Sequence, residues 1–78
     1  MDYTEARQQF AARLSQLRRE KRITQDELAE LIDKTTDYIS LLERGERSPS
    51  FEVILELAEA LSVPPSYLSG FISCDSFD

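Results

Sequence analysis

The segment at residues 24–45 constrains the fold more than any other part of this chain; it reads TQDELAELIDKTTDYISLLERG. Thr24 and Glu27 have the spacing of a capping box, in which the hydroxyl accepts from the amide three residues on and the carboxylate accepts from the amide of the cap. Apolar residues at three- and four-residue steps then predict the buried face of a short helix. These residues are Leu28, Leu31 and Ile32, with Ala29 beside them. The segment is therefore predicted to begin with a capped helix.

A turn and a second helix complete this segment. Asp33 and Lys34 interrupt the apolar pattern, and either Thr35 or Thr36 can cap a second run. The apolar positions of that run are Tyr38, Ile39 and Leu42. Gly45 has no Cβ, which is common just after a helix C-terminus, so the second helix is predicted to end before it. The predicted arrangement is helix, turn, helix.

Apolar spacing outside this segment predicts three more helices. The first opens at Asp2 or Thr4, and its buried face contains Phe10, Leu14 and Leu17. The fourth, FEVILELAEAL, follows a cap at Ser50, and Pro65 or Ser66 begins a brief fifth helix. The buried stripe of the fourth helix is predicted to contain Ile54, Leu57, Ala58 and Leu61. The sequence therefore predicts an all-α fold, a compact five-helix bundle.

Length and composition fit one small domain. A chain of 78 residues buries only about 60 to 65% of its unfolded surface, so a dimer interface can add to a core with little margin. Apolar residues make up 41% of the chain, with two Gly and three Pro, which favours a helical domain over disorder. We expect one domain at residues 1–70 and a short C-terminal tail at residues 71–78.

The residue inventory argues against catalysis and metal binding. The chain has no His and one Cys, Cys74, so neither a disulfide, a zinc site nor a Cys-His nucleophile pair can be assembled from it. No Gly-rich phosphate loop is present either, and we expect no enzyme activity, cofactor or small-molecule ligand. No run approaches the roughly 20 apolar residues of a membrane span, and the first residues lack the apolar core of a signal peptide. A cytoplasmic protein without a membrane partner is the expectation.

The net charge of −6 is unevenly distributed along the chain. All nine Lys and Arg lie within residues 7–47, and ten acids up to Glu46 leave residues 1–47 with a charge of −1. Residues 48–78 contain five acids and no base, hence −5. Four cations gather at the end of the first helix, where they either interact with the helix dipole or face a phosphate: Arg18, Arg19, Lys21 and Arg22. One face of the domain can therefore be basic while another is acidic.

Several spaced residues carry a family resemblance. They are Gln25, Glu27-Leu28-Ala29, Ile39-Ser40, Glu43-Arg44-Gly45 and Pro49-Ser50. Together, over about residues 14–68, they resemble the helix-turn-helix domain of phage repressors and Cro, the XRE-type bacterial regulators. The tripeptide Tyr38-Ile39-Ser40 ahead of Glu43 is similar to regulators of that family, including restriction-modification controller proteins. The resemblance implies a sequence-specific regulator of transcription that binds double-stranded DNA as a homodimer on a palindromic operator.

The resemblance also implies which residues meet DNA. In such domains the second helix, here about residues 36–44, enters the major groove, while the first helix lies across the backbone. The residues that fall where base-reading side chains project are Thr36, Asp37 and Leu41, with Tyr38 and Ser40 beside them. The residues expected near the DNA backbone are Gln25, Arg44, Arg47 and Ser48. Thr35, ahead of the second helix, completes the expected DNA-binding set.

The identities of these residues set what they can read. Asp37 can only accept a hydrogen bond, so a cytosine N4 amine is its one sensible major-groove partner. Leu41 offers apolar contact with a thymine methyl; alternatively, Leu41 and Leu31 are exposed leucines that contact a protein partner. Asp33 departs from the family, whose turn usually has Gly, but Asp tolerates a positive φ better than most residues.

Two other sets of residues have expected structural roles. Arg18 and Glu43 correspond to a family ion pair that ties the first helix to the recognition helix. The residues at the C-terminal end are either tail residues or part of a two-fold interface: Tyr67, Leu68, Phe71 and Ile72.

Two functions of different classes fit these observations. The first is a sequence-specific DNA-binding regulator that acts as a homodimer. The second is a protein-interaction module on the same fold, antitoxin-like or antagonist-like, with weakened DNA contacts; Asp37, Leu41 and the acidic C-terminal third favour it.

Overall fold

The computed structural model describes residues 3–68, and within that span it contains five α-helices and no strand. The helices are α1 (Tyr3–Glu20), α2 (Gln25–Leu31), α3 (Thr36–Glu43), α4 (Phe51–Ala60) and α5 (Pro65–Leu68). The predicted all-α fold is therefore confirmed. No helix in the described part of the chain is long and apolar enough to cross a membrane.

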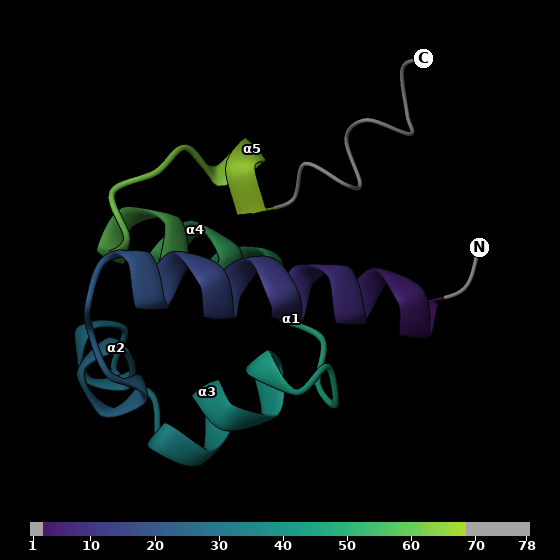
Figure 1. The fold of residues 1–78 in the computed structure, drawn as a ribbon, viewed down its shortest axis with the longest axis horizontal. Coiled ribbons are helices and arrows are strands. Elements are labelled where there is room, and N and C mark those ends of the chain that lie inside the picture. Colours follow the sequence, from purple (N-terminus) through teal and green to yellow (C-terminus); the bar gives the residue numbers. More distant parts are fainter. Residues whose placement is uncertain (1–2, 69–78) are drawn as a thin grey trace.

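Helix α1 forms the centre of the bundle. In Figure 1 it crosses the whole view, with α3 on one side and α4 and α5 on the other. Helix α3 packs against both α2 and α1, and α5 packs against α4 and α1. The helix-turn-helix pair α2–α3 thus stands at one side of the molecule, supported by α1 from behind.

Side-chain caps fix where three helices begin. At α2 the Thr24 hydroxyl accepts from the amide of Glu27 at 3.0 Å, and the Glu27 carboxylate accepts from the amide of Thr24 at 2.8 Å, which completes the capping box. The Thr35 hydroxyl accepts from the amide of Tyr38 at 3.1 Å, so Thr35, of the two candidates, caps α3. Ser50 caps α4 as predicted.

The first four helices end with one backbone motif. After each helix, the amides of two successive residues donate hydrogen bonds to carbonyls of the last helical turn. The first of these two residues has a positive φ. These residues are Arg22 (φ 62°), Asp33 (φ 59°), Gly45 (φ 74°) and Ser62 (φ 59°). Three of the four carry a Cβ in a conformation that usually favours glycine, so the helix ends hold backbone strain.

Asp33 offers a direct measure of that strain. We expect Asp33→Gly to raise the free energy of unfolding by up to about 1 kcal/mol, because Gly adopts the left-handed conformation without a steric penalty. Asp37→Gly is the matched control; it lies in the first turn of α3, where the backbone is helical and Gly should not raise stability. Thermal or urea unfolding of the two variants measures both changes. A destabilised Asp33→Gly would contradict this explanation of the turn.

The core lies between α1 and the other helices. Its thirteen buried residues are Phe10, Leu14, Leu17, Leu28, Ala29, Ile32, Ile39, Leu42, Val53, Leu57, Ala58, Leu61 and Leu68. Within residues 4–68 no polar or charged residue, taken as a whole, is as buried as these. The described part of the bundle is therefore held together chiefly by packing between the apolar faces of its helices.

One predicted buried position was wrong, and another is only partly buried. Leu31 is 61% exposed. It lies about 100° around the helix from the centre of the face that Leu28, Ala29 and Ile32 bury. In α4 Val53 is buried and Ile54 is only half-buried, because Val53 lies one turn before Leu57 on the same face.

Candidate nucleic-acid interface

Helix α3 has one face fixed in the core and one face turned outward. Ile39 and Leu42 are fully buried. On the other side, a shallow surface depression is lined by Asp37, Ser40, Leu41 and Arg44. Asp37 is exposed and Leu41 is half-buried, so neither is sealed beneath other side chains. Four residues that the sequence assigned to DNA contact therefore share one accessible surface.

The start of α3 is tied to α2 by hydrogen bonds. The Thr36 hydroxyl donates to the Asp26 carboxylate. That bond uses the only proton of the hydroxyl and leaves its lone pairs and the methyl group for other contacts. With Thr35 serving as the cap, both threonines help to set the position of the helix as well as its surface.

An ion pair joins α1 to the end of α3. Arg18 Nε donates to Glu43 Oε2 at 2.6 Å and Arg18 Nη2 donates to Glu43 Oε1 at 3.1 Å, so the contact is bidentate. The two side chains are only 13% and 6% exposed. The hydrogen bonds that Arg18 donates to Glu43, and the negative charge of Glu43, raise the pKa of Arg18 above its ordinary value, against the opposing effect of burial. Arg18 Nη1 also donates to the carbonyl of Ile23, at 2.9 Å.

Gln25 belongs to the same network. Its Nε2 donates to Glu43 Oε1 at 3.0 Å. An amide nitrogen carries two protons, so one N–H of Gln25 remains for another acceptor. Glu43 thus receives three hydrogen bonds and connects α1, α2 and α3 at a single carboxylate.

The remaining predicted backbone contacts lie on the loop after α3 and beside it. Arg44 forms an exposed ion pair with Glu46 at 3.3 Å, a type of contact that contributes little to stability. The Arg47 guanidinium lies 5.5 Å from the centre of the Tyr38 ring, and Ser48 is exposed. Sequence reasoning missed Arg7, whose Nε donates to the Gly45 carbonyl at 3.2 Å and fastens this loop to α1.

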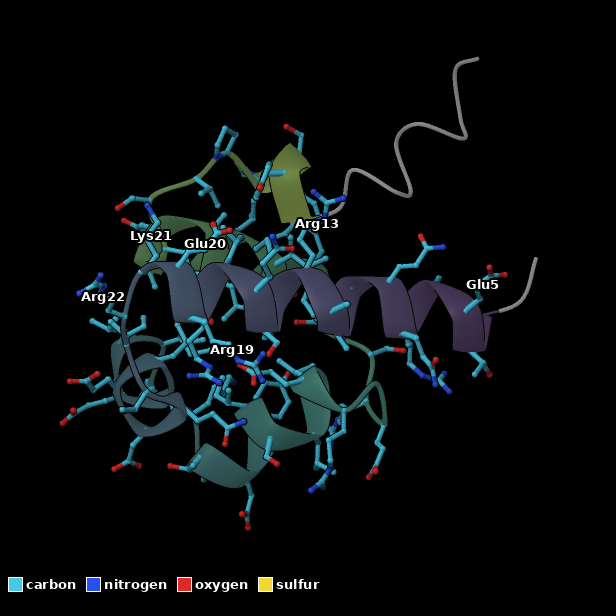
Figure 2. The ribbon with its side chains drawn as sticks, viewed as in Figure 1. Glu5, Arg13, Arg19, Glu20, Lys21 and Arg22 are labelled. Atoms are coloured by element: carbon cyan, nitrogen blue, oxygen red, sulfur yellow. The ribbon has the colours of Figure 1, made fainter. Side chains whose placement is uncertain are left out.

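No single surface is formed by four cations of α1 and the turn after it, Arg13, Arg18, Arg19 and Lys21. Arg18 is taken up by Glu43. Figure 2 shows Arg19 extending toward the side of α3 and Lys21 on the opposite side of α1, near α4. Arg13 extends toward α5, where its guanidinium lies 5.1 Å from the centre of the Tyr67 ring. Apart from the paired Arg18, only Arg19 of these four is directed toward the helix-turn-helix side.

The residues assigned to a dimer interface have different environments. Tyr67 is 43% exposed, whereas Leu68 is fully buried in the core and offers no side-chain surface. Phe71, Ile72 and Cys74 lie outside the described residues. Two large apolar residues that sequence reasoning did not assign to an interface are exposed on α4, Phe51 (71%) and Leu55 (40%). They are one helical turn apart, so they form a short apolar stripe.

No set of three or more metal-binding side chains is gathered within residues 3–68. The predicted contact residues are most concentrated on the outward face of α3. Their side chains offer hydrogen bonds, charge and apolar contact.

Comparisons with known proteins agree with this architecture. A family model described as helix-turn-helix, HTH_3, matches residues 14–68. The HTH-type transcriptional regulator y4dJ of Sinorhizobium fredii is 40% identical over 57 residues, which cover 73% of this chain and 74% of that protein. The HTH-type transcriptional regulator PrpR of Mycobacterium tuberculosis is 38% identical over 58 residues, which cover 74% of this chain but only 12% of that protein.

One solved structure is similar to this chain over nearly the whole length of the solved chain. The crystal structure of the restriction-modification controller protein C.AhdI from Aeromonas hydrophila matches with a TM-score of 0.83 and 37% sequence identity. The match covers 87% of this chain and 99% of that chain. The family resemblance read from the spaced residues of the sequence is thereby confirmed.

Proposed function

Since this chain belongs to the XRE-type helix-turn-helix family of transcriptional regulators, we propose that it recognises a specific DNA sequence by inserting α3 into the major groove. The observation that carries this proposal is the two-sided build of α3. Ile39 and Leu42 anchor one face, while Asp37, Ser40, Leu41 and Arg44 line the other. A recognition helix needs both features, because base reading requires side chains at fixed positions on an open surface.

We assign base reading to three residues. The methyl group of Thr36 and the side chain of Leu41 contact thymine methyls, and Asp37 accepts from a cytosine N4 amine. Because the Thr36 hydroxyl already donates to Asp26, it acts toward DNA only as an acceptor. None of these side chains is an Arg or Lys that reads guanine, so part of the specificity comes from DNA shape and from binding as a dimer.

Backbone contacts hold the helix in register. The free N–H of Gln25 donates to a phosphate at the start of α2, where the amides of the first turn add a favourable field. Arg44, Arg47 and Ser48 contact phosphates on the other side of α3, and Thr35, Tyr38 and Ser40 border the groove. Glu43 cannot approach a phosphate without repulsion, but its charge is compensated by Arg18.

The molecule acts as a homodimer in this proposal. Residues 1–70 form the DNA-binding domain, and residues 71–78 extend the interface. Phe51, Leu55 and Tyr67 are exposed apolar side chains that a second copy of the chain can cover. Two-fold symmetry then presents two recognition helices about 34 to 36 Å apart, one turn of the duplex, to a palindromic operator.

Leu55 tests the dimer. We expect Leu55→Asp to weaken dimerisation by roughly 100-fold, because the variant loses apolar burial and places a charge in the interface. Sedimentation equilibrium measures the change. Leu31→Asp is the matched control, an exposed leucine of α2 that should leave the dimer intact. If Leu55→Asp sediments as the wild type does, this part of α4 is not in the interface.

The salt dependence of DNA binding tests the function itself. Cations that neutralise phosphates release counterions, so the logarithm of the binding constant should fall linearly and steeply with the logarithm of salt concentration. The net charge of −6 adds a long-range repulsion from DNA that salt screens, so the binding constant should be measured over a range that includes both low and physiological salt. Retention of no duplex at any salt concentration would overturn the proposal.

One observation favours a protein partner as a second candidate function. A groove between α2 and α4 is lined by Leu31, Ile32, Asp33, Glu56, Glu59 and Ala60, and Leu31 is exposed within it. An exposed leucine ringed by carboxylates suits a partner segment that carries an apolar side chain among cations. This groove shares no lining residue with the outward face of α3.

A further inference from the structure

Two cations and an aromatic ring meet beside the start of α3. Lys34 Nζ lies 5.8 Å from the centre of the Tyr38 ring, and the Arg47 guanidinium lies 5.5 Å from the same centre. Tyr38 is half-buried and packs against the core, so its ring is fixed. We call Lys34, Tyr38 and Arg47 the Tyr38 cluster. Its cations come from the turn before α3 and from the loop after it.

The ring brings together two like charges that would otherwise repel. A cation within about 6 Å of an aromatic ring centre is attracted by the negative face of the ring. Both side chains are exposed, and within residues 3–68 neither forms an ion pair with a carboxylate. Glu46, which precedes Arg47 in the chain, pairs with Arg44 instead. The cluster therefore presents two cations that form no ion pair with a carboxylate in the described part of the chain, although Lys34 borders a depression also lined by Asp26, Glu30 and Asp33.

We propose that the Tyr38 cluster is a phosphate site, in which Lys34 and Arg47 together bind the phosphodiester backbone of one DNA strand beside the groove that α3 enters. The inference rests on the proposed function and adds Lys34 to it. Because the two cations lie 5.8 and 5.5 Å from the same ring centre, they are close enough to meet neighbouring phosphates of one strand. Arg47 supplies a planar fork and Lys34 a point charge, while Tyr38 limits the freedom of both side chains.

The site also explains how a negative protein can hold DNA at this helix. Asp37, one residue before Tyr38, repels phosphate. Two cations placed at Tyr38 offset that repulsion, and they do so without regard to base sequence. The Tyr38 cluster therefore positions α3, and base discrimination is left to its outward face.

The test compares the salt dependence of binding for matched charge-removing variants. Lys34→Gln and Arg47→Gln are each expected to make the plot of log binding constant against log salt shallower by about 0.9 for each phosphate that the variant no longer neutralises. Affinity should fall by the same factor on a specific and on a random-sequence duplex. Lys21→Gln, the same chemical change at a lysine on the opposite side of α1, should leave the slope unchanged. Thermal melting of each variant confirms that it is folded.

Substitutions at Tyr38 test whether the phosphate site needs the ring or whether the ring lies near the two cations by chance. Tyr38→Phe keeps the ring and should keep the slope, whereas Tyr38→Leu should weaken binding to both duplexes if the ring positions the cations. If the wild type shows a steep slope and Lys34→Gln retains it, the phosphate site is wrong although DNA binding stands. If the wild type binds no duplex, the proposed function fails and this site fails with it.

Discussion

Replacing Arg18 with alanine is expected to lower the free energy of unfolding by about 3 to 5 kcal/mol, because it leaves a buried carboxylate without its counter-charge. Glu43 is only 6% exposed, and two of its three hydrogen bonds come from Arg18. For a domain of this size the loss corresponds to a fall in melting temperature of at least about 10 °C. A domain with a total stability of about 5 to 15 kcal/mol has little left after such a change.

Two companion variants identify the cause of that loss. Arg19→Ala removes the exposed neighbouring arginine and should change stability by less than about 0.5 kcal/mol. The double variant Arg18→Met with Glu43→Leu removes both charges, and it should recover most of the stability because no charge is then stranded. Equal melting temperatures for Arg18→Ala and Arg19→Ala would show that the pair does not hold α1 to α3.

The second large effect is expected at the outward face of α3. Leu41→Glu places another carboxylate in the depression that Asp37 already lines. Like charges set against each other across an interface cost several kcal/mol, so affinity for every duplex should fall by roughly 100-fold or more. Gel-shift titration measures this loss, and the melting temperature should change little because Leu41 is only half-buried.

Leu31→Glu is the control for this variant. It makes the same substitution at an exposed leucine of the other helix of the pair, in a separate groove. DNA binding should therefore be retained. Equal losses for the two variants would mean that overall charge, and not the face of α3, governs the affinity.

Local chemistry made the helix boundaries predictable. A hydroxyl that accepts from the amide three residues on caps the first turn of a helix, and Thr24 and Ser50 do so at the positions that the sequence indicated. The choice between Thr35 and Thr36 could not be made from the sequence, since both side chains can cap. A contact between two helices decides the choice. The Thr36 hydroxyl donates to Asp26 of α2, and Thr35 caps α3.

Packing direction was harder to predict. Helix α2 has only seven residues, and apolar spacing over so short a helix does not fix the centre of its buried face. That face is set by contact with α3 and α4, and it excludes Leu31. The same is true of Leu68, where burial against the rest of the domain removed a residue expected at an interface.

Contacts between residues far apart in the sequence were the hardest to predict from local sequence patterns. Arg18 and Glu43 are 25 positions apart, and only the family resemblance suggested that they pair. The Tyr38 cluster joins Lys34 to Arg47 across the whole of α3, and no periodic pattern links those positions. Both arrangements follow from the way α3 is seated on α1 and α2, which the sequence specifies only through the complete fold.

The most direct test of sequence-specific recognition by α3 is selection of bound duplexes from a random-sequence pool by the intact protein. We expect enrichment of a palindrome whose half-sites are centred about one helical turn, 10 to 10.5 base pairs, apart. Thymine should be preferred at the positions that face Thr36 and Leu41, and cytosine at the position that faces Asp37. A bound pool with no enriched sequence, or with a single unpaired half-site, would contradict recognition by a two-fold pair of α3 helices.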